Sequence, residues 1–185
     1  MRPPTGSSLY RRLARRELYR NPWVAVDVYD MVHPTGVAGE HVSIAAGRAS
    51  GVLVLDGDAF VLARQARFAA DAQVLEIVKG GADEGESALA CAQRELREEL
   101  GLEAASWTPL GVAYEIPSIV EHAVALFLAR DVRAGVSAPE GVEAIESVRM
   151  DVEDAYRAAS DGRIDDAVTL AALLRYRLLI SGTGH

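Results

Sequence analysis

The fold of this chain is decided by residues 80–102, which read GGADEGESALACAQRELREELGL. The second half of this stretch has apolar residues at three- and four-residue steps, which predicts an amphipathic helix. These residues are Leu89, Ala92 or Gln93, Leu96 and Leu100. Gly101 follows them, at a position where a glycine commonly ends a helix. We therefore expect one helix that docks on a core through its apolar side.

The polar side of this helix carries three glutamates that point to metal chemistry. Glu95, Glu98 and Glu99 are spaced i, i+3 and i+4, so a helix places them on one face. A hard cation such as Mg²⁺, which prefers oxygen ligands, converts the mutual repulsion of such carboxylates into binding. The glycine-rich residues 80–85 let backbone approach a metal or a phosphate closely. The structural alternative is a solvated helix rich in Glu and Arg.

The overall composition narrows the class of protein. The chain has 185 residues, half of them apolar, which suits one domain with a sizeable core. The formal net charge is −8, and because residues 1–20 hold six arginines against one glutamate, the remainder is strongly acidic. An acidic body argues against nucleic-acid partners. Cys91 is the only cysteine, so a reducing, cytoplasmic location is expected. No apolar run approaches the ~20 residues of a membrane span.

The segments around the helix alternate like β-strands. We expect strands at residues 23–31, 41–46, 51–55, 59–64, 73–78, 110–116, 123–129 and 145–150. Pro34-Thr35-Gly36 indicates a turn and Asp56-Gly57-Asp58 a hairpin. Asp151 can cap a helix through Ser160, and a last helix is expected at residues 165–180. Residues 1–20 are expected to form a solvated arm or a short helix. Together these elements predict a mixed sheet packed between helical layers.

The stretch at residues 80–102 resembles the Nudix box, G-x5-E-x7-R-E-U-x-E-E-x-G-U, in which U is aliphatic. All nine fixed positions are filled, by Gly80, Glu86, Arg94, Glu95, Leu96, Glu98, Glu99, Gly101 and Leu102. The resemblance implies an α/β fold, the Nudix α/β/α sandwich around a mixed sheet. It also implies hydrolysis of a diphosphate linkage that depends on Mg²⁺, with Mn²⁺ as a substitute.

The same resemblance implies roles for individual residues. Glu98 and Glu99 resemble metal ligands, and Glu99 also counts among the catalytic residues. Glu95 shares the metal or binds a second ion. Glu86 resembles an auxiliary ligand or a helix anchor. Arg94 resembles a catalytic residue that orients the glutamates through ion pairs.

Outside the box, residues 21–180 weakly resemble the ADP-ribose pyrophosphatase branch. The similar segments are residues 21–23 (NPW), 62–67 (LARQAR), 75–80 (LEIVKG) and 162–167 (GRIDDA). In this branch the backbone carbonyl before the box, here that of Lys79, often reaches the metal. Arg67 either holds a phosphate or forms a surface ion pair. Glu76 either contacts base or ribose or pairs with an arginine.

The loop after the box departs from the branch in part. Pro117 lies sixteen residues past Gly101, about where the branch has a signature proline, and Glu121 matches its acidic loop residue. Both are implied to contact the substrate. However, Ser118 stands where the branch usually has glycine, and the loop is shorter. This departure favours an alternative, a nucleoside triphosphate pyrophosphohydrolase.

The general base is expected in a loop late in the chain. Glu140, Glu143 and Glu146 are the candidates, and Glu143 best matches the offset of the branch from the strand at residues 145–150. A solvated loop acid is the alternative for each of them.

The resemblance implies an N-terminal extension at residues 1–43, which helps to form a homodimer, and a Nudix hydrolase domain at residues 44–185. The expected substrate is a nucleoside diphosphate linked to another moiety, above all ADP-ribose, cleaved to AMP and ribose 5-phosphate. No membrane partner is expected. A non-catalytic nucleotide-sensing module is the remaining alternative, and the intact acids speak against it.

Overall fold

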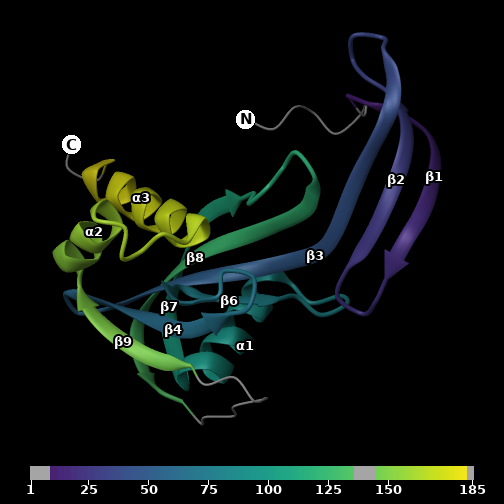
Figure 1. The fold of residues 1–185 in the computed structure, drawn as a ribbon. Helices are drawn as coiled ribbons and strands as arrows, with labels where there is room; N and C mark the ends of the chain where they lie inside the picture. The colour runs from purple at the N-terminus through teal and green to yellow at the C-terminus, as the bar shows by residue number, and fades with distance from the viewer. Residues whose placement is uncertain (1–8, 136–144, 183–185) are drawn as a thin grey trace. The chain divides into compact units, whose positions relative to one another are not determined.

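The computed structural model describes residues 9–135 and 145–182, and the chain divides into two compact units. The first unit comprises residues 1–47 and 116–122, and the second comprises residues 48–115 and 123–185. The strands belong to a nine-stranded mixed sheet, and strand β3 begins in the first unit and ends in the second (Figure 1). The expected division between an extension and a domain at residues 43 and 44 stays a prediction.

The first unit is built from three antiparallel strand segments. They are β1 (Arg11–Arg20), β2 (Ala25–Val32) and the first part of β3 (Ala38–Asp56). The turn between β1 and β2 is closed by Asn21, whose side-chain oxygen accepts hydrogen bonds from the backbone N–H groups of Trp23 and Val24 at 2.9 and 2.7 Å. Gly36 adopts a φ of 88° in the next turn, which confirms the turn expected at residues 34–36.

Whereas residues 1–8 lie outside the described residues, residues 11–20 form strand β1 and not the loose solvated arm or short helix that was expected. All ten of its residues are exposed, so it carries no buried alternation that would have revealed it. Four of its five arginines form ion pairs: Arg12 with Glu121, Arg15 with Asp27 and Glu17, Arg16 with Glu40, and Arg20 with Glu17. Strand pairing with β2 and these ion pairs hold the segment extended, and neither is visible in a local sequence pattern.

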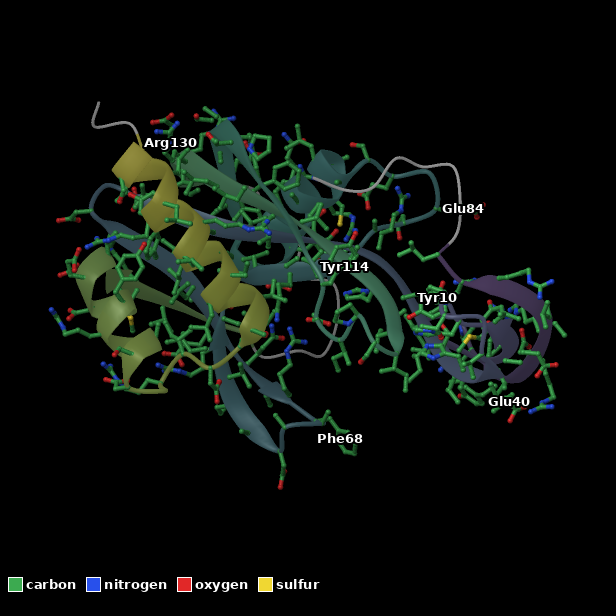
Figure 2. The ribbon with its side chains drawn as sticks, turned by 90° about the horizontal axis from the view of Figure 1, so that it is seen from above. Tyr10, Glu40, Phe68, Glu84, Tyr114 and Arg130 are labelled. Atoms are coloured by element: carbon green, nitrogen blue, oxygen red, sulfur yellow. The ribbon has the colours of Figure 1, made fainter. Side chains whose placement is uncertain are left out.

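The second unit contains the remaining strands and the three helices of the described residues. In chain order they are β4 (Ala59–Arg67), β5 (Ala72–Glu76), β6 (Val78–Gly81), α1 (Ala88–Leu100), β7 (Leu102–Ala113), β8 (Val120–Ala134, whose first three residues belong to the first unit), β9 (Glu146–Asp151), α2 (Val152–Ser160) and α3 (Ala167–Gly182). Phe68 is fully exposed at the tip of the β4–β5 hairpin (Figure 2).

Helices cover both faces of the sheet in the second unit. On β3, Val52 packs in a core with α1, whereas the adjacent Leu53 packs in a core with α2 and α3. On β4, Val61 packs in the core with α1, and the adjacent Phe60 packs in the core with α2 and α3. Because successive side chains of a strand point to opposite faces, α1 covers one face while α2 and α3 cover the other (Figure 1). This arrangement confirms the predicted α/β/α sandwich.

Several local predictions are refined by the structure. The single strand expected at residues 73–78 is two strands, because β5 pairs with β4 whereas β6 pairs with β3. The strands expected at residues 41–46 and 51–55 are one continuous strand, β3. Asp151 occupies the N-cap of α2, but its side chain makes no capping hydrogen bond. Gly57 and Gly101 have φ values of 64° and 63°, as the predicted hairpin and helix end require.

Candidate active site

Helix α1 packs against the core and carries the glutamates of the box that follow Arg94. Ser87 caps its first turn, with its hydroxyl accepting a hydrogen bond from the N–H of Ala90 at 3.1 Å. Ala92 and Leu96 are fully buried against the sheet, which fixes the rotation of the helix. Glu95 and Glu98, one and two residues away from Leu96, are thereby held at a defined place.

Arg94 is the centre of the acidic face. Its Nη1 donates to Glu95 at 2.7 Å and to Glu98 at 2.9 Å. Its Nε and Nη2 donate to both oxygens of Glu86 at 3.1 and 3.0 Å, and Nη2 also donates to the carbonyl of Gly81 at 2.7 Å. The hydrogen bonds from Arg94 hold the pKa of Glu86 below its usual value. One guanidinium therefore ties the helix to the loop that precedes it, with the ion pairs that the box resemblance implies.

Gly80 lies directly against the carboxylate of Glu95. A Cβ atom at residue 80 would stand 1.9 Å from Cδ of Glu95 and 2.0 and 2.2 Å from its oxygens. Glycine leaves room there for the carboxylate, which a larger residue would displace. Burial raises the pKa of Glu95, and its bond to Arg94 offsets part of that effect. The first glycine of the box thus has a steric function in this chain.

Cys91 lies behind the same loop. It is fully buried, and its thiol donates a weak hydrogen bond to the carbonyl of Gly80 at 3.5 Å. Burial raises the pKa of the thiol, which keeps it protonated and unreactive. The expectation of a small buried residue is confirmed, and the structure adds a contact with the loop.

The acidic face has the donor chemistry of a site for a hard divalent cation. Glu86, Glu95, Glu98 and Glu99 supply carboxylate oxygens, the ligand type that Mg²⁺ and Mn²⁺ prefer. Within residues 9–135 and 145–182, no three His, Cys, Asp or Glu side chains are grouped closely enough to hold a metal ion. Arg94 instead engages one oxygen each of Glu95 and Glu98. The chemical type of these side chains therefore suits a divalent cation. To bind one, the carboxylates would have to rotate towards a common point.

Three further predicted residues lie together where β4, β5 and β6 approach one another, near the start of α3. Glu76 is almost completely buried, and its carboxylate accepts hydrogen bonds from Arg67 at 2.7 Å and from Gln65 at 2.7 Å. The ammonium group of Lys79 lies 2.8 Å from the other oxygen of Glu76. The structure thus brings Arg67, Glu76 and Lys79 together. Glu76 pairs with an arginine, which was one of the two alternatives expected for it.

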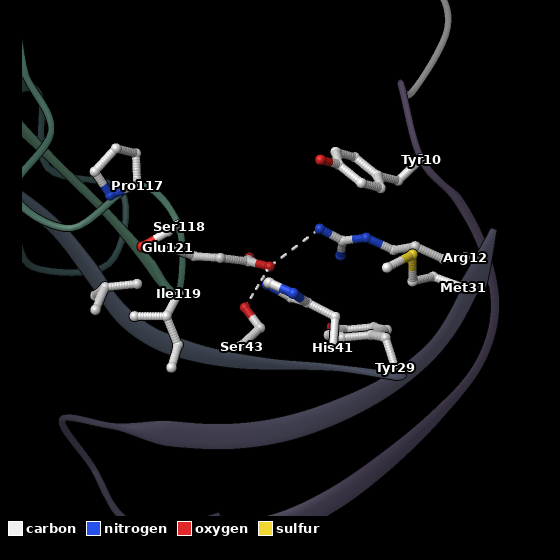
Figure 3. A pocket seen from close by; sticks show the side chains of 11 residues that line it. Tyr10, Arg12, Tyr29, Met31, His41, Ser43, Pro117, Ser118, Ile119 and Glu121 are labelled. Carbon is white, nitrogen blue, oxygen red and sulfur yellow. Dashed lines mark hydrogen bonds and ion pairs between the residues drawn. The ribbon is translucent and has the colours of Figure 1, made fainter. Parts of the chain in front are cut away.

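The other two predicted substrate residues belong to the first unit. Pro117 and Glu121 line a cavity of about 240 Å³ together with Tyr10, Arg12, Tyr29, Met31, His41, Ser43, Ser118, Ile119 and Val120 (Figure 3). The carboxylate of Glu121 accepts hydrogen bonds from Ser43 at 2.8 Å and from Arg12 at 3.0 Å. The guanidinium of Arg12 also lies 4.5 Å from the centre of the Tyr29 ring.

The loop of candidate bases is only partly described. Glu140 and Glu143 lie outside the described residues, so the general-base assignment stays a prediction. Glu146 starts β9 and pairs with Arg64 at 3.0 Å.

Sequence reasoning missed Asp166, which contacts Lys79. Its carboxylate accepts a hydrogen bond from the Lys79 ammonium at 2.7 Å and two from Thr169. The signal present in the sequence was an aspartate three residues before a threonine at the start of the last helix, a capping pattern. That pattern gives no indication of the contact with Lys79, which is 87 residues away in the chain.

Comparison with known proteins agrees with this geometry. The model of the NUDIX domain matches residues 45–173. An ADP-ribose pyrophosphatase of Bacillus subtilis (strain 168) is 26% identical over 166 residues, which cover 88% of this chain and 90% of that protein. A structure described as an ADP compounds hydrolase superposes with a TM-score of 0.85 at 22% identity and covers 98% of this chain and 99% of that one, so the fold is shared.

The described helices contain no segment long and apolar enough to cross a membrane. The family match covers more than half of the chain and includes the whole of α1, the Arg94 ion pairs and the contact of Gly80 with Glu95. The chain therefore belongs to the Nudix family of hydrolases.

Proposed function

We propose that this Nudix hydrolase cleaves the diphosphate of ADP-ribose to AMP and ribose 5-phosphate. The observation that carries the proposal is the Arg94 cluster, in which one guanidinium holds Glu86, Glu95 and Glu98 at the end of a glycine-rich loop. The ADP-ribose pyrophosphatase named among the relatives supports the choice of substrate. Nudix hydrolases typically depend on a divalent metal ion.

The box glutamates and one backbone carbonyl are the proposed metal ligands. Glu95, Glu98 and Glu99 would hold Mg²⁺ or Mn²⁺, with Glu86 and the carbonyl of Lys79 as further ligands. When bound, the ion polarises phosphoryl oxygens and lowers the pKa of a coordinated water. Arg94 keeps Glu86, Glu95 and Glu98 from repelling one another while the site is assembled.

The reaction is a substitution at phosphorus by water. The water oxygen forms a bond to one phosphorus while the bond from that phosphorus to the bridging oxygen breaks, and the bridging oxygen leaves with the other phosphate. Glu143 is the proposed base that accepts the proton of the water. Glu99 and Arg94 complete the proposed catalytic residues, the first as a ligand and the second by orientation.

Four residues are proposed to contact the substrate. Arg67 would bind a phosphate oxygen and Glu76 would hold Arg67 in place or contact the ribose, because the two are joined by a short ion pair. Pro117 and Glu121 are also proposed to contact the substrate. We also propose a homodimer formed through residues 1–43 and a cytoplasmic location.

The test is hydrolysis of a nucleotide panel by the full-length protein with Mg²⁺ and with Mn²⁺. ADP-ribose should have a higher kcat/KM than any nucleoside triphosphate, with AMP and ribose 5-phosphate as products. A clear preference for a triphosphate with release of pyrophosphate would select the second candidate, which Ser118 after Pro117 favours. A rate equal to that of the metal-free blank on every substrate would instead indicate a nucleotide-sensing module.

A further inference from the structure

A network of charged side chains, mostly buried, joins β4, β5 and β6 to the start of α3. The ammonium group of Lys79 lies 2.8 Å from Glu76 and 2.7 Å from Asp166, and Arg67 closes the network through Glu76. The exposed fractions of the Lys79 and Asp166 side chains are only 14% and 15%, and that of Glu76 is 1%. Two acids balance two bases, so removal of one member leaves a poorly solvated charge without its partner.

The same short strand touches this network on one side and the box on the other. Strand β6 pairs with β3, with Gly51 opposite Lys79 and Ser50 opposite Gly80. Next to Lys79, Gly80 lies against the carboxylate of Glu95. The backbone of residues 79–81 is thus held from the α3 side by the Lys79 side chain, and from the α1 side by the residues of the box.

We infer that Asp166 is a positioning residue for a divalent cation at the box. By fixing the side chain of Lys79, Asp166 holds the Lys79 carbonyl and the Gly80 backbone at the distance that the glutamates of α1 require. This inference rests on the proposed function, because it takes the box as the metal site. Asp166 itself contacts neither the cation nor the substrate.

Asp166 also caps α3, and this second role must be separated from the first. One carboxylate oxygen accepts hydrogen bonds from the N–H and the hydroxyl of Thr169 at 2.8 and 2.6 Å. The Thr169 hydroxyl in turn accepts a hydrogen bond from the N–H of Ile77 at 3.0 Å. Thr169→Val therefore weakens the cap and the contact with the sheet while the pair of Lys79 with Asp166 remains. It is the matched control for a loss of stability alone.

The first measurement is Mn²⁺ binding to the full-length protein without substrate, followed by electron paramagnetic resonance of free Mn²⁺. Asp166→Asn should weaken Mn²⁺ binding by ~10- to 100-fold, the range typical of residues that orient metal ligands from outside the coordination shell. Thr169→Val should bind Mn²⁺ as the wild type does. In a Lys79→Met background, Asp166→Asn should add little, because its effect passes through Lys79. Equal weakening in Asp166→Asn and Thr169→Val would overturn the inference, and so would unchanged binding in Asp166→Asn.

The second measurement is hydrogen exchange at the end of β6, which needs no metal. The N–H of Ala82 donates to the carbonyl of Arg48 at 2.8 Å and reports on the order of this backbone. Asp166→Asn and Lys79→Met should both speed its exchange, whereas Thr169→Val should not. Unchanged exchange in both charge variants would refute the positioning role. Absence of Mn²⁺ binding by the wild type would instead count against the metal site itself, and exchange would still decide the role of Asp166.

Discussion

Because Gly80 lies against the carboxylate of Glu95, adding one methyl group at residue 80 should impair activity much more than stability. In Gly80→Ala the new Cβ would stand 1.9 to 2.2 Å from three atoms of the Glu95 carboxyl group, well inside van der Waals contact. The carboxylate is the far end of a flexible side chain, so it can move away at a modest cost. It must then leave Arg94, to which it is bonded at 2.7 Å. We expect a folded protein in which one box glutamate is displaced.

The expected cost in stability is small. A hydrogen bond between charged groups contributes about 1.5–3 kcal/mol. Replacing glycine by alanine returns about 0.4–1 kcal/mol, because the unfolded chain loses conformational freedom. The net loss is therefore about 0.5–2.6 kcal/mol, which lowers Tm by roughly 1–10 °C in a chain of this size. The rate should fall much further, by at least ~10²-fold in kcat, the usual loss when a charge-stabilising group is displaced.

Gly81→Ala is the matched control. It adds the same methyl group one residue further on, and its Cβ would meet no atom within 4 Å. Both variants should be assayed for ADP-ribose hydrolysis at saturating Mg²⁺ and for thermal unfolding. The reasoning fails if Gly80→Ala keeps near-wild-type kcat, or if Gly81→Ala loses as much activity as Gly80→Ala.

Four further variants test other parts of the site and the fold. Arg94→Lys should lower kcat/KM for ADP-ribose by ~10- to 100-fold, because one ammonium cannot replace the branched contacts of the guanidinium; steady-state kinetics showing no loss would contradict this role. Glu99→Gln should lower kcat by at least ~10²-fold with an unchanged circular dichroism spectrum. A kcat close to that of the wild type would show that Glu99 is not a metal ligand. Glu143→Gln should lower kcat by ~10²–10⁴-fold with little change in KM, whereas Glu146→Gln, three residues further along the chain, should stay active; the reverse result would move the base to Glu146. Burial raises the pKa of Tyr156 to about 12, so the stability that the protonated tyrosine contributes is full below pH 10 and is lost as the pH rises towards 12. Denaturant unfolding of Tyr156→Phe should lack this alkaline loss, and an equal loss in the variant would rule out the tyrosine as its cause.

The box was predictable from sequence because its chemistry is local. A helix period of 3.6 residues places Glu95 and Glu98 on one face whatever the rest of the chain does. Gly101 ends α1 with a φ of 63°, which a short sequence signal predicts because few other residues adopt that conformation. The order of strands and helices along the chain likewise predicted a mixed sheet packed between helical layers.

What could not be predicted are the contacts that join distant segments. Lys79 and Asp166 are 87 residues apart, and each alone reads as an ordinary charged residue. Strand β1 is exposed at every position, so its partner β2 determines its conformation and its own pattern does not. The periodicity of a segment indicates which of its faces is buried. It does not indicate which side chain of another helix or strand that face will contact.

In the proposed metal site, the charges of the box would allow Arg94 and a metal ion to share the same glutamates. Glu86, Glu95, Glu98 and Glu99 bring four negative charges to the cluster, and Arg94 neutralises only one. The neighbouring carboxylates Glu98 and Glu86 add to the effect of burial in raising the pKa of Glu95. A divalent cation would remove two of the three remaining charges, so its binding is favoured even though Arg94 stays in place. In the proposed metal site, Arg94 would therefore act as a partial counter-ion: it lets the four acids lie beside one another and would leave enough negative charge to attract a metal ion.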